Sequence, residues 1–82
     1  MSDLKEVRVK INEVDKQMAK LFEQRMNLAK QVAEFKIENS LPIEDKVREA
    51  QLIEKNSSLI ENNEIKEYYI DYLKSVISIS KQ

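Results

Sequence analysis

Apolar residues recur at intervals of three and four along most of the chain and almost never alternate in twos. This spacing is typical of amphipathic helices and gives no indication of β-strands, so the sequence predicts an all-α protein. The longest such run, from about residue 4 to residue 38, contains no helix breaker and predicts one continuous helix. Its apolar seam has the spacing of a heptad repeat and consists of Leu4, Val7, Ile11, Val14, Met18, Leu21, Leu28, Val32 and Phe35.

Two shorter helices are expected after a break at "IENSLPIED", residues 37–45. Pro42 ends the first helix because it lacks the backbone N–H of a continuing helix and disfavours helical geometry in the residue before it. The second helix is expected over about residues 45–56, with Asp45 as its N-cap. A loop rich in asparagine then precedes a third helix over about residues 64–81.

The pattern also predicts which faces of the shorter helices are buried. In the second helix Val47, Ala50 and Ile53 can pack inward. One face of the third helix carries Ile65, Tyr69, Leu73, Val76, Ile77 and Ser80. Ser80 is therefore expected to look inward, whereas Ser78 lies on the polar face. An inward serine most often donates to the carbonyl three or four residues back, so its orientation alone indicates no function.

The length of the first helix is incompatible with a compact monomer. Eighty-two residues form a single domain, residues 1–82, near the size at which one core is only marginally stabilising. A helix over residues 4–38 is roughly 50 Å long, whereas a compact chain of this size has a radius of gyration of about 12 Å. The sequence therefore predicts that a second copy, related by a two-fold axis, covers the protruding half in a homodimer.

The composition excludes several kinds of chemistry. The chain has no Cys, His, Trp or Gly, so thiolate nucleophiles, zinc clusters, imidazole bases and glycine-rich phosphate loops are ruled out, and no metal site is expected. Fourteen basic and fifteen acidic residues give a net charge of -1, which argues against binding to nucleic acid or to a membrane surface. No segment resembles a secretion signal or a membrane span, so a cytoplasmic protein is expected.

The most informative polar residue is Arg25, which interrupts the seam four residues after Leu21 and three before Leu28. A buried, unpaired guanidinium costs several kcal/mol, so Arg25 needs a carboxylate partner, either a protein side chain such as Glu49 or a ligand. Lys36 lies eleven residues further, about 16 Å along nearly the same face. The two long side chains can lean toward a common gap of a size that suits a compact dianion.

Two further groups of charged residues could belong to the same site. Arg8 lies seventeen residues before Arg25, about 25 Å along the rod, so it could reach that gap only from a second subunit. Asp45, Arg48 and Glu49 project from one face of the second helix because they are spaced as i, i+3 and i+4. Such charges are common on solvated helices, and capping is a sufficient explanation for Asp45, so the triplet alone does not establish a site.

Taken together, these features resemble one known family. The segments "LKEVRVKINEVDKQMAKLFEQRMNLAKQVAEFK", "PIEDKVRE" and "VISIS" are similar to the all-helical class of chorismate mutases (chorismate mutase type II) over essentially the whole chain. In that family one arginine lies near the start of the long helix, a second arginine lies on its seam, and a lysine lies near its end. A D-x-x-R-E run begins helix two, and a serine lies near the end of helix three. The matching positions here are Arg8, Arg25, Lys36, Asp45, Arg48, Glu49 and Ser80.

The resemblance implies an intertwined homodimer of three-helix subunits, in which each active site takes Arg8 from the neighbouring subunit. It also implies an isomerase that rearranges the dianion chorismate to prephenate in the biosynthesis of phenylalanine and tyrosine. This Claisen rearrangement is unimolecular and needs no cofactor or metal. A chain without His or Cys can therefore carry it out.

By the same resemblance the catalytic residues are Lys36, Glu49 and Arg25. Lys36 is expected to donate a hydrogen bond to the ether oxygen as negative charge grows on it, and Glu49 to accept one from the ring hydroxyl. Arg8 and Arg25 are expected to clamp the two carboxylates. The rest of the substrate-binding wall is expected to consist of Asp45, Arg48 and Ser80.

Alternatives remain open at the level of the sequence. An isochorismate-pyruvate lyase has the same fold and much the same charged pocket. A non-catalytic helical dimerisation module would explain the seam, but it gives no reason for Arg25 and Lys36. The family also has a glutamine or glutamate one turn after the serine, which here would be position 84, whereas the chain ends at Gln82. Either Gln82 bends back into the pocket, or the role is vacant, or the natural C-terminus is longer.

Overall fold

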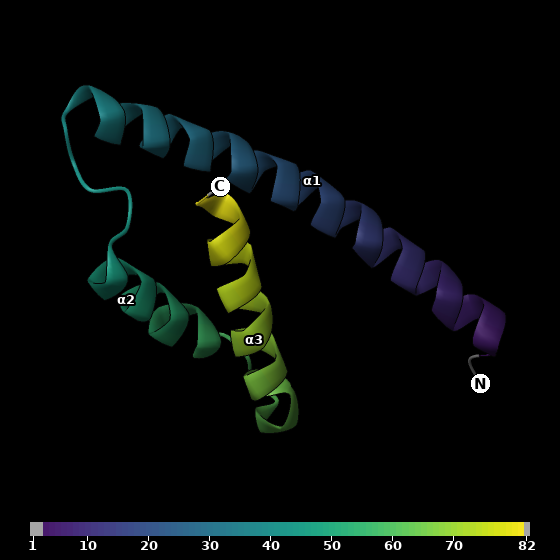
Figure 1. The fold of residues 1–82 in the computed structure, drawn as a ribbon. Coiled ribbons are helices and arrows are strands. Elements are labelled where there is room, and N and C mark those ends of the chain that lie inside the picture. Colours follow the sequence, from purple (N-terminus) through teal and green to yellow (C-terminus); the bar gives the residue numbers. More distant parts are fainter. Residues whose placement is uncertain (1–2, 82) are drawn as a thin grey trace.

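The computed structural model describes residues 3–81 (Figure 1). Within this range the chain forms three helices, α1 (Leu4–Glu38), α2 (Lys46–Ser57) and α3 (Asn63–Ser80), and no strand. The expected all-α class, with one long and two shorter helices, is therefore confirmed. Gln82, whose role the sequence left open, lies outside the described residues.

Local hydrogen bonds fix both ends of α1. Asp3 is the N-cap, and its Oδ1 accepts from the backbone N–H of Glu6 at 2.9 Å. At the other end Ser40 has a positive φ of 54°, and the N–H of Leu41 donates to the carbonyl of Lys36 at 2.8 Å. This arrangement is a Schellman motif, in which glycine usually takes the position with positive φ. Because the chain has no glycine, Ser40 adopts that conformation here.

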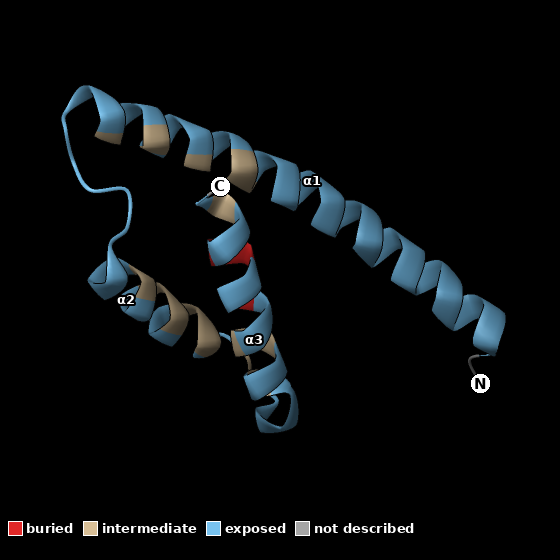
Figure 2. Ribbon diagram, viewed as in Figure 1, coloured by how far each residue is buried: buried red, intermediate tan, exposed pale blue. Residues whose placement is uncertain are grey.

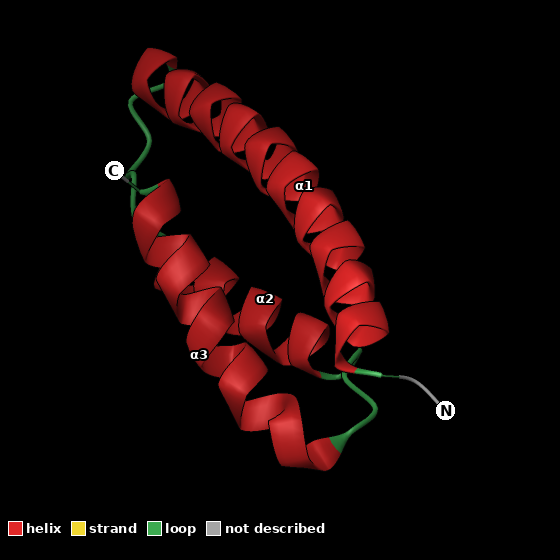
Figure 3. Cartoon of the chain, turned by 90° about the vertical axis from the view of Figure 1, so that its right-hand side faces the viewer, coloured by secondary structure: helices red, strands yellow, loops and turns green. Residues whose placement is uncertain are grey.

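The core of the subunit is small and centres on α3. Among residues 3–81 three hydrophobic residues are buried, Leu73, Val76 and Ile77; they are spaced as i, i+3 and i+4 and therefore lie on one face of α3. α3 packs against α2 and also meets α1, whereas no Cα atom of α1 comes within 8 Å of one in α2. Figure 3 shows α2 and α3 side by side, with α1 passing along their flank. α3 is thus the element that connects the other two helices.

The inner face of α2 differs from the one that the apolar pattern predicts. Val47 is 70% exposed and Ala50 is exposed as well, so the expectation that they pack inward was wrong, whereas Ile53 is half-buried as expected. The half-buried positions of α2 are Glu49, Leu52, Ile53, Asn56 and Ser57. The reason is that α2 has only α3 to pack against within the subunit, so one narrow stripe is covered and Val47 lies outside it.

The subunit is extended because half of α1 has no partner within the chain. The Cα radius of gyration is 16.2 Å and the principal extents are 57 × 25 × 16 Å, against about 12 Å for the radius of a compact chain of this length. Figure 2 shows the N-terminal half of α1 exposed along its whole length. None of the helices within residues 3–81 is both long enough and apolar enough to cross a membrane.

Candidate active site

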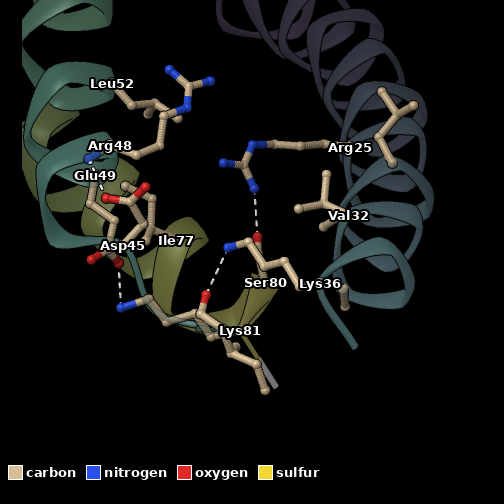
Figure 4. Close-up of a pocket in the computed structure, with 14 residues that line it drawn as sticks. Arg25, Val32, Lys36, Asp45, Arg48, Glu49, Leu52, Ile77, Ser80 and Lys81 are labelled. Carbon is tan, nitrogen blue, oxygen red and sulfur yellow. Dashed lines mark hydrogen bonds and ion pairs between the residues drawn. The ribbon is translucent and has the colours of Figure 1, made fainter. Parts of the chain in front are cut away.

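A pocket of about 380 Å³ lies between α1 and α2 (Figure 4). Residues from the C-terminal half of α1 line one wall, and the first turns of α2 with the loop before it line the other. Ile77, Ser80 and Lys81 line it from the end of α3. The space exists because α1 and α2 each pack against α3 but not against each other. Its volume falls within the range of small-molecule sites.

Six of the seven site residues expected from the sequence line this one pocket, although they come from three different helices and one helix cap. They are Arg25, Lys36, Asp45, Arg48, Glu49 and Ser80. Arg8 does not line it, and it is exposed on the N-terminal half of α1. The single chain therefore assembles the expected constellation except for the arginine that the sequence assigned to a second subunit.

Arg25 reaches across the pocket from α1 to the end of α3. Its Nη1 donates to Oγ of Ser80 at 2.5 Å, and the Ser80 hydroxyl in turn donates to the carbonyl of Val76 at 2.6 Å. Ser80 thus makes the bond to the carbonyl four residues back that the sequence suggests, and it also orients Arg25. Among the described residues no carboxylate pairs with Arg25, so the ion pair with Glu49 that the sequence left open is not formed.

Lys36 lies on the same wall as Arg25, near the end of α1. Its Nζ donates to the backbone carbonyl of Ile43 at 2.8 Å. The turn after α1 brings this carbonyl back toward the helix, because the chain reverses at Ser40 and runs past the lysine. The ammonium group therefore rests on a neutral acceptor at the edge of the pocket, and within residues 3–81 it forms no ion pair.

Asp45 and Arg48 bring the start of α2 to the pocket. Asp45 is the N-cap of α2, and its Oδ1 accepts from the backbone N–H of Arg48 at 3.0 Å. The capping explanation from the sequence is therefore correct for Asp45, and the same residue also lines the pocket. Figure 4 shows the Arg48 side chain reaching from α2 into the space that Arg25 enters from α1.

Glu49 has a partner that sequence reasoning missed. Its Oε1 pairs with Nζ of Lys81, which also pairs with Oε1 of Glu44 at 3.1 Å. The two carboxylates raise the pKa of Lys81, with Glu49 as the larger cause, and Lys81 in turn lowers the pKa of Glu44. The only sequence signal for Lys81 is that it follows Ser80 directly. Its pairing depends on how the end of α3 meets the start of α2.

The pocket combines a positive charge with an apolar wall. Four of its lining side chains are cationic, Arg25, Lys36, Arg48 and Lys81, and two are anionic, Asp45 and Glu49. The net charge of two positive units complements a dianion. Aliphatic residues of all three helices face the same space, and they can hold the carbon skeleton of a small ring compound. Such a site can fix two carboxylates by hydrogen bonds and ion pairs and can stabilise charge that develops on an oxygen between them.

A family model described as chorismate mutase type II matches residues 7–82 of the chain. A chorismate mutase from Methanocaldococcus jannaschii is 38% identical over 64 residues, which are 78% of this chain and 65% of that protein. A bifunctional chorismate mutase/prephenate dehydratase from Buchnera aphidicola subsp. Schizaphis graminum is 38% identical over 76 residues, or 93% of this chain and 20% of the relative.

A bifunctional enzyme of the same description from Aquifex aeolicus is 38% identical over 55 residues, or 67% of this chain and 15% of that enzyme. The chain thus spans about a fifth or less of the length of these bifunctional relatives and just under two thirds of the shorter one. No solved structure matches the chain significantly.

Proposed function

The chain belongs to the chorismate mutase type II family, and from this membership we propose that it catalyses the rearrangement of chorismate to prephenate. The observation that carries the proposal is the pocket between α1 and α2, in which six charged residues from distant parts of the sequence meet with a net charge of two positive units. Chorismate carries two carboxylates and a ring, which correspond to the charged and the aliphatic parts of the lining.

In the proposed mechanism arginine side chains hold the substrate in its reactive shape. The enolpyruvyl arm of chorismate must fold over the ring before the C–C bond can form, and two arginines, Arg25 and Arg8 of a second subunit, clamp the carboxylates in that conformer. Arg25 is prepared for this role because Ser80 holds its Nη1. Within residues 3–81 its other N–H groups have no partner, so they can bind a carboxylate bidentately.

Lys36 is proposed to act on the breaking bond. The C–O bond of the ether breaks ahead of C–C bond formation, so negative charge grows on the ether oxygen in the transition state. Lys36 donates to the carbonyl of Ile43, and a small rotation of its long side chain would present the ammonium to the substrate instead. Losing one such donor typically costs about 10²–10³ in rate.

The start of α2 is proposed to bind the other polar groups of the substrate. Glu49 accepts a hydrogen bond from the ring hydroxyl, and Arg48, whose backbone N–H is held by Asp45, extends toward a carboxylate. No group of the pocket needs to transfer a proton, because the reaction only rearranges bonds within chorismate. The residues therefore work by positioning and electrostatics.

We further propose that the functional unit is an intertwined homodimer of this single domain. The apolar seam of α1 supports this, because it is long, regular and exposed in the isolated subunit. Arg8 lies on the exposed half of the same helix, about 25 Å along the axis from Arg25, too far to reach the pocket of its own chain. In a two-fold assembly each α1 would deliver its Arg8 to the pocket of the other subunit.

The direct test of the activity is the loss of chorismate absorbance on adding purified protein, with the product identified chromatographically. We expect prephenate from chorismate and no pyruvate from isochorismate. Release of pyruvate from isochorismate without turnover of chorismate would make the chain a lyase. Failure to act on either substrate would leave a helical dimerisation module as its function.

The shared site can be tested by mixing two inactive variants. Arg8→Ala and Arg25→Ala chains, refolded together in equal amounts, should recover about a quarter of wild-type activity per subunit, because half of the dimers are mixed and each has one intact site of two. Each variant refolded alone is the control and should stay nearly inactive. If subunit exchange is demonstrated and no activity returns, both arginines belong to the same subunit's site.

A further inference from the structure

We propose that Lys81 is a positioning residue that holds the Glu49 carboxylate through Oε1 and leaves Oε2 to accept the hydroxyl of the substrate. Neither the family motif nor the sequence pattern includes this lysine. The inference rests on the proposed function, because it concerns how the same pocket binds its substrate. It adds a specific role for a residue at the end of α3.

The first support is the arrangement of the contacts. Nζ of Lys81 pairs with Oε1 of Glu49 and with Oε1 of Glu44, at 3.1 Å for the latter. The side chains of Glu49 and Lys81 are 21% and 34% exposed, so both are partly shielded from water, whereas that of Glu44 is 55% exposed. Among the described residues Lys81 is the one hydrogen-bond or ion-pair partner of the Glu49 side chain, and this contact is made to Oε1. One oxygen of the carboxylate is thus anchored while the other stays available.

The second support is the charge that the pocket must present. An uncompensated carboxylate in the wall would repel a dianionic substrate, and the low polarity of the aliphatic lining would strengthen that repulsion. Lys81 compensates the charge of Glu49 without removing its capacity to accept a hydrogen bond. Without Lys81, the net charge of the lining would fall from two positive units to one.

The third support is the place of Lys81 in the fold. It is the C-cap of α3, and its two partners lie in the loop before α2 and in the first turn of α2. The Lys81 ammonium group therefore links the C-terminal end of α3 to two points near the start of α2, Glu44 and Glu49. Glutamate has three rotatable side-chain bonds, and anchoring one of its oxygens restricts them before the substrate arrives.

A purely structural role predicts a different outcome. Exposed ion pairs contribute little to stability, so a Lys81 that served only as a surface pair would leave both stability and kinetics nearly unchanged when replaced. A positioning role predicts a change in substrate binding at almost constant stability. The two roles can therefore be separated by measuring KM, kcat and thermal unfolding of the same variants.

The variant that tests the proposal is Lys81→Met, which keeps the stem and removes the charge. We expect KM for chorismate to rise about tenfold, since a charge-assisted contact that orients the acceptor is lost, with kcat within about threefold of wild type. Lys81→Arg should restore most of the affinity. Lys74→Met, on the same helix and without an ion pair among the described residues, is the matched control and should leave KM unchanged.

A double-mutant cycle identifies the partner. In a Glu49→Gln background Lys81→Met should have little further effect on KM, because the carboxylate that it positions is already absent. An equal effect of Lys81→Met in both backgrounds would overturn the proposal, since Lys81 would then act independently of Glu49. A wild-type KM for Lys81→Met would also overturn the proposal.

An independent readout separates this inference from the proposed function. In protein with ¹⁵N-labelled lysine, the Lys81 ammonium resonance should shift on Glu49→Gln but not on Glu54→Gln, an exposed glutamate of the same helix. If wild-type protein does not turn over chorismate, the proposed function fails and the kinetic role of Lys81 fails with it, whatever the resonance shows. If wild type is active and the resonance does not respond to Glu49→Gln, only the pairing proposal fails.

Discussion

The two halves of α1 have the same helical geometry and the same apolar spacing but opposite environments. Every described residue from Asp3 to Gln24 is exposed, whereas the half-buried residues of the helix all lie in its C-terminal part. These are Arg25, Met26, Ala29, Ala33 and Lys36. A regular sequence pattern therefore does not by itself say which part of a helix its own chain covers.

The covered stripe of α1 is also not the apolar seam. Leu28, Val32 and Phe35 are 53–59% exposed, although they belong to the heptad pattern. The stripe that turns toward α3 instead includes two alanines, Ala29 and Ala33, whose small side chains leave room for the pocket between Arg25 and Lys36. Leu28 and Val32 of the seam line the same pocket as the alanines, so in the C-terminal half both stripes border it, whereas the seam of the N-terminal half is left for the proposed second copy.

The largest effect on assembly and activity is expected from a charge placed on the apolar seam in the N-terminal half of α1. Val14→Glu should dissociate the proposed dimer and abolish activity, because assembly would bury an unpaired carboxylate at a cost of several kcal/mol. Sedimentation equilibrium should give the monomer mass. Asn12→Glu is the control, because two residues turn the helix by about 200° and place the added charge away from the seam.

The assembly of the wild-type protein is tested by measuring its mass in solution and its unfolding at several protein concentrations. Its midpoint of unfolding should rise with protein concentration, since association and folding are linked in an obligate dimer. A monomeric mass for wild type, with unfolding independent of concentration, would show that the exposed seam has another use. The comparison between the two halves of α1 would then lose its explanation.

The next largest effect is expected within the pocket half, at Lys36. Lys36→Met and Lys36→Gln should both lower kcat by about two orders of magnitude or more, Met more than Gln, because only glutamine can still donate to the ether oxygen. KM should change less, and the dimer should persist because Lys36 is not on the seam. A rise in KM at constant kcat would instead assign Lys36 to a carboxylate of the bound substrate.

The smallest effect is expected at Asp45, where a structural and a binding role coincide. Asp45→Ala should destabilise the protein by about 1 kcal/mol, because the cap on the N–H of Arg48 is lost. Asp45→Asn should keep the cap and most of the stability, so any change in its KM reports the charge of Asp45 in the pocket. Thermal unfolding and steady-state kinetics of the two variants separate the roles. Equal stability of both would show that the cap contributes little.

Much of this architecture could be predicted without the structure. The 3–4 spacing of apolar residues and Pro42 indicated three helices, because helical periodicity and the missing N–H of proline are local properties. The polar residue on the seam, Arg25, and its register with Lys36 indicated a charged gap on α1, because both lie on one rigid helix. The capping role of Asp45 was equally local.

Contacts between helices were not predictable in the same way. The sequence left open a pair between Arg25 and Glu49, but in the fold Arg25 binds Ser80 and Glu49 binds Lys81. Val47 was expected inside and lies outside. Each of these outcomes depends on the angle and depth at which α3 meets α1 and α2, which no single helix determines.

The sequence by itself determined which residues share a face of each helix, because each residue turns the helix by a fixed angle of about 100°. The tertiary structure decided which faces meet. Within the subunit α3 is the only helix that packs against both others, so it holds α1 and α2 apart, opens the pocket between them and places Ser80 and Lys81 at its end. It also leaves the N-terminal half of α1 bare, because only α3 packs against α1 and the residues of α1 that it helps to cover all lie in the C-terminal part of this 35-residue helix.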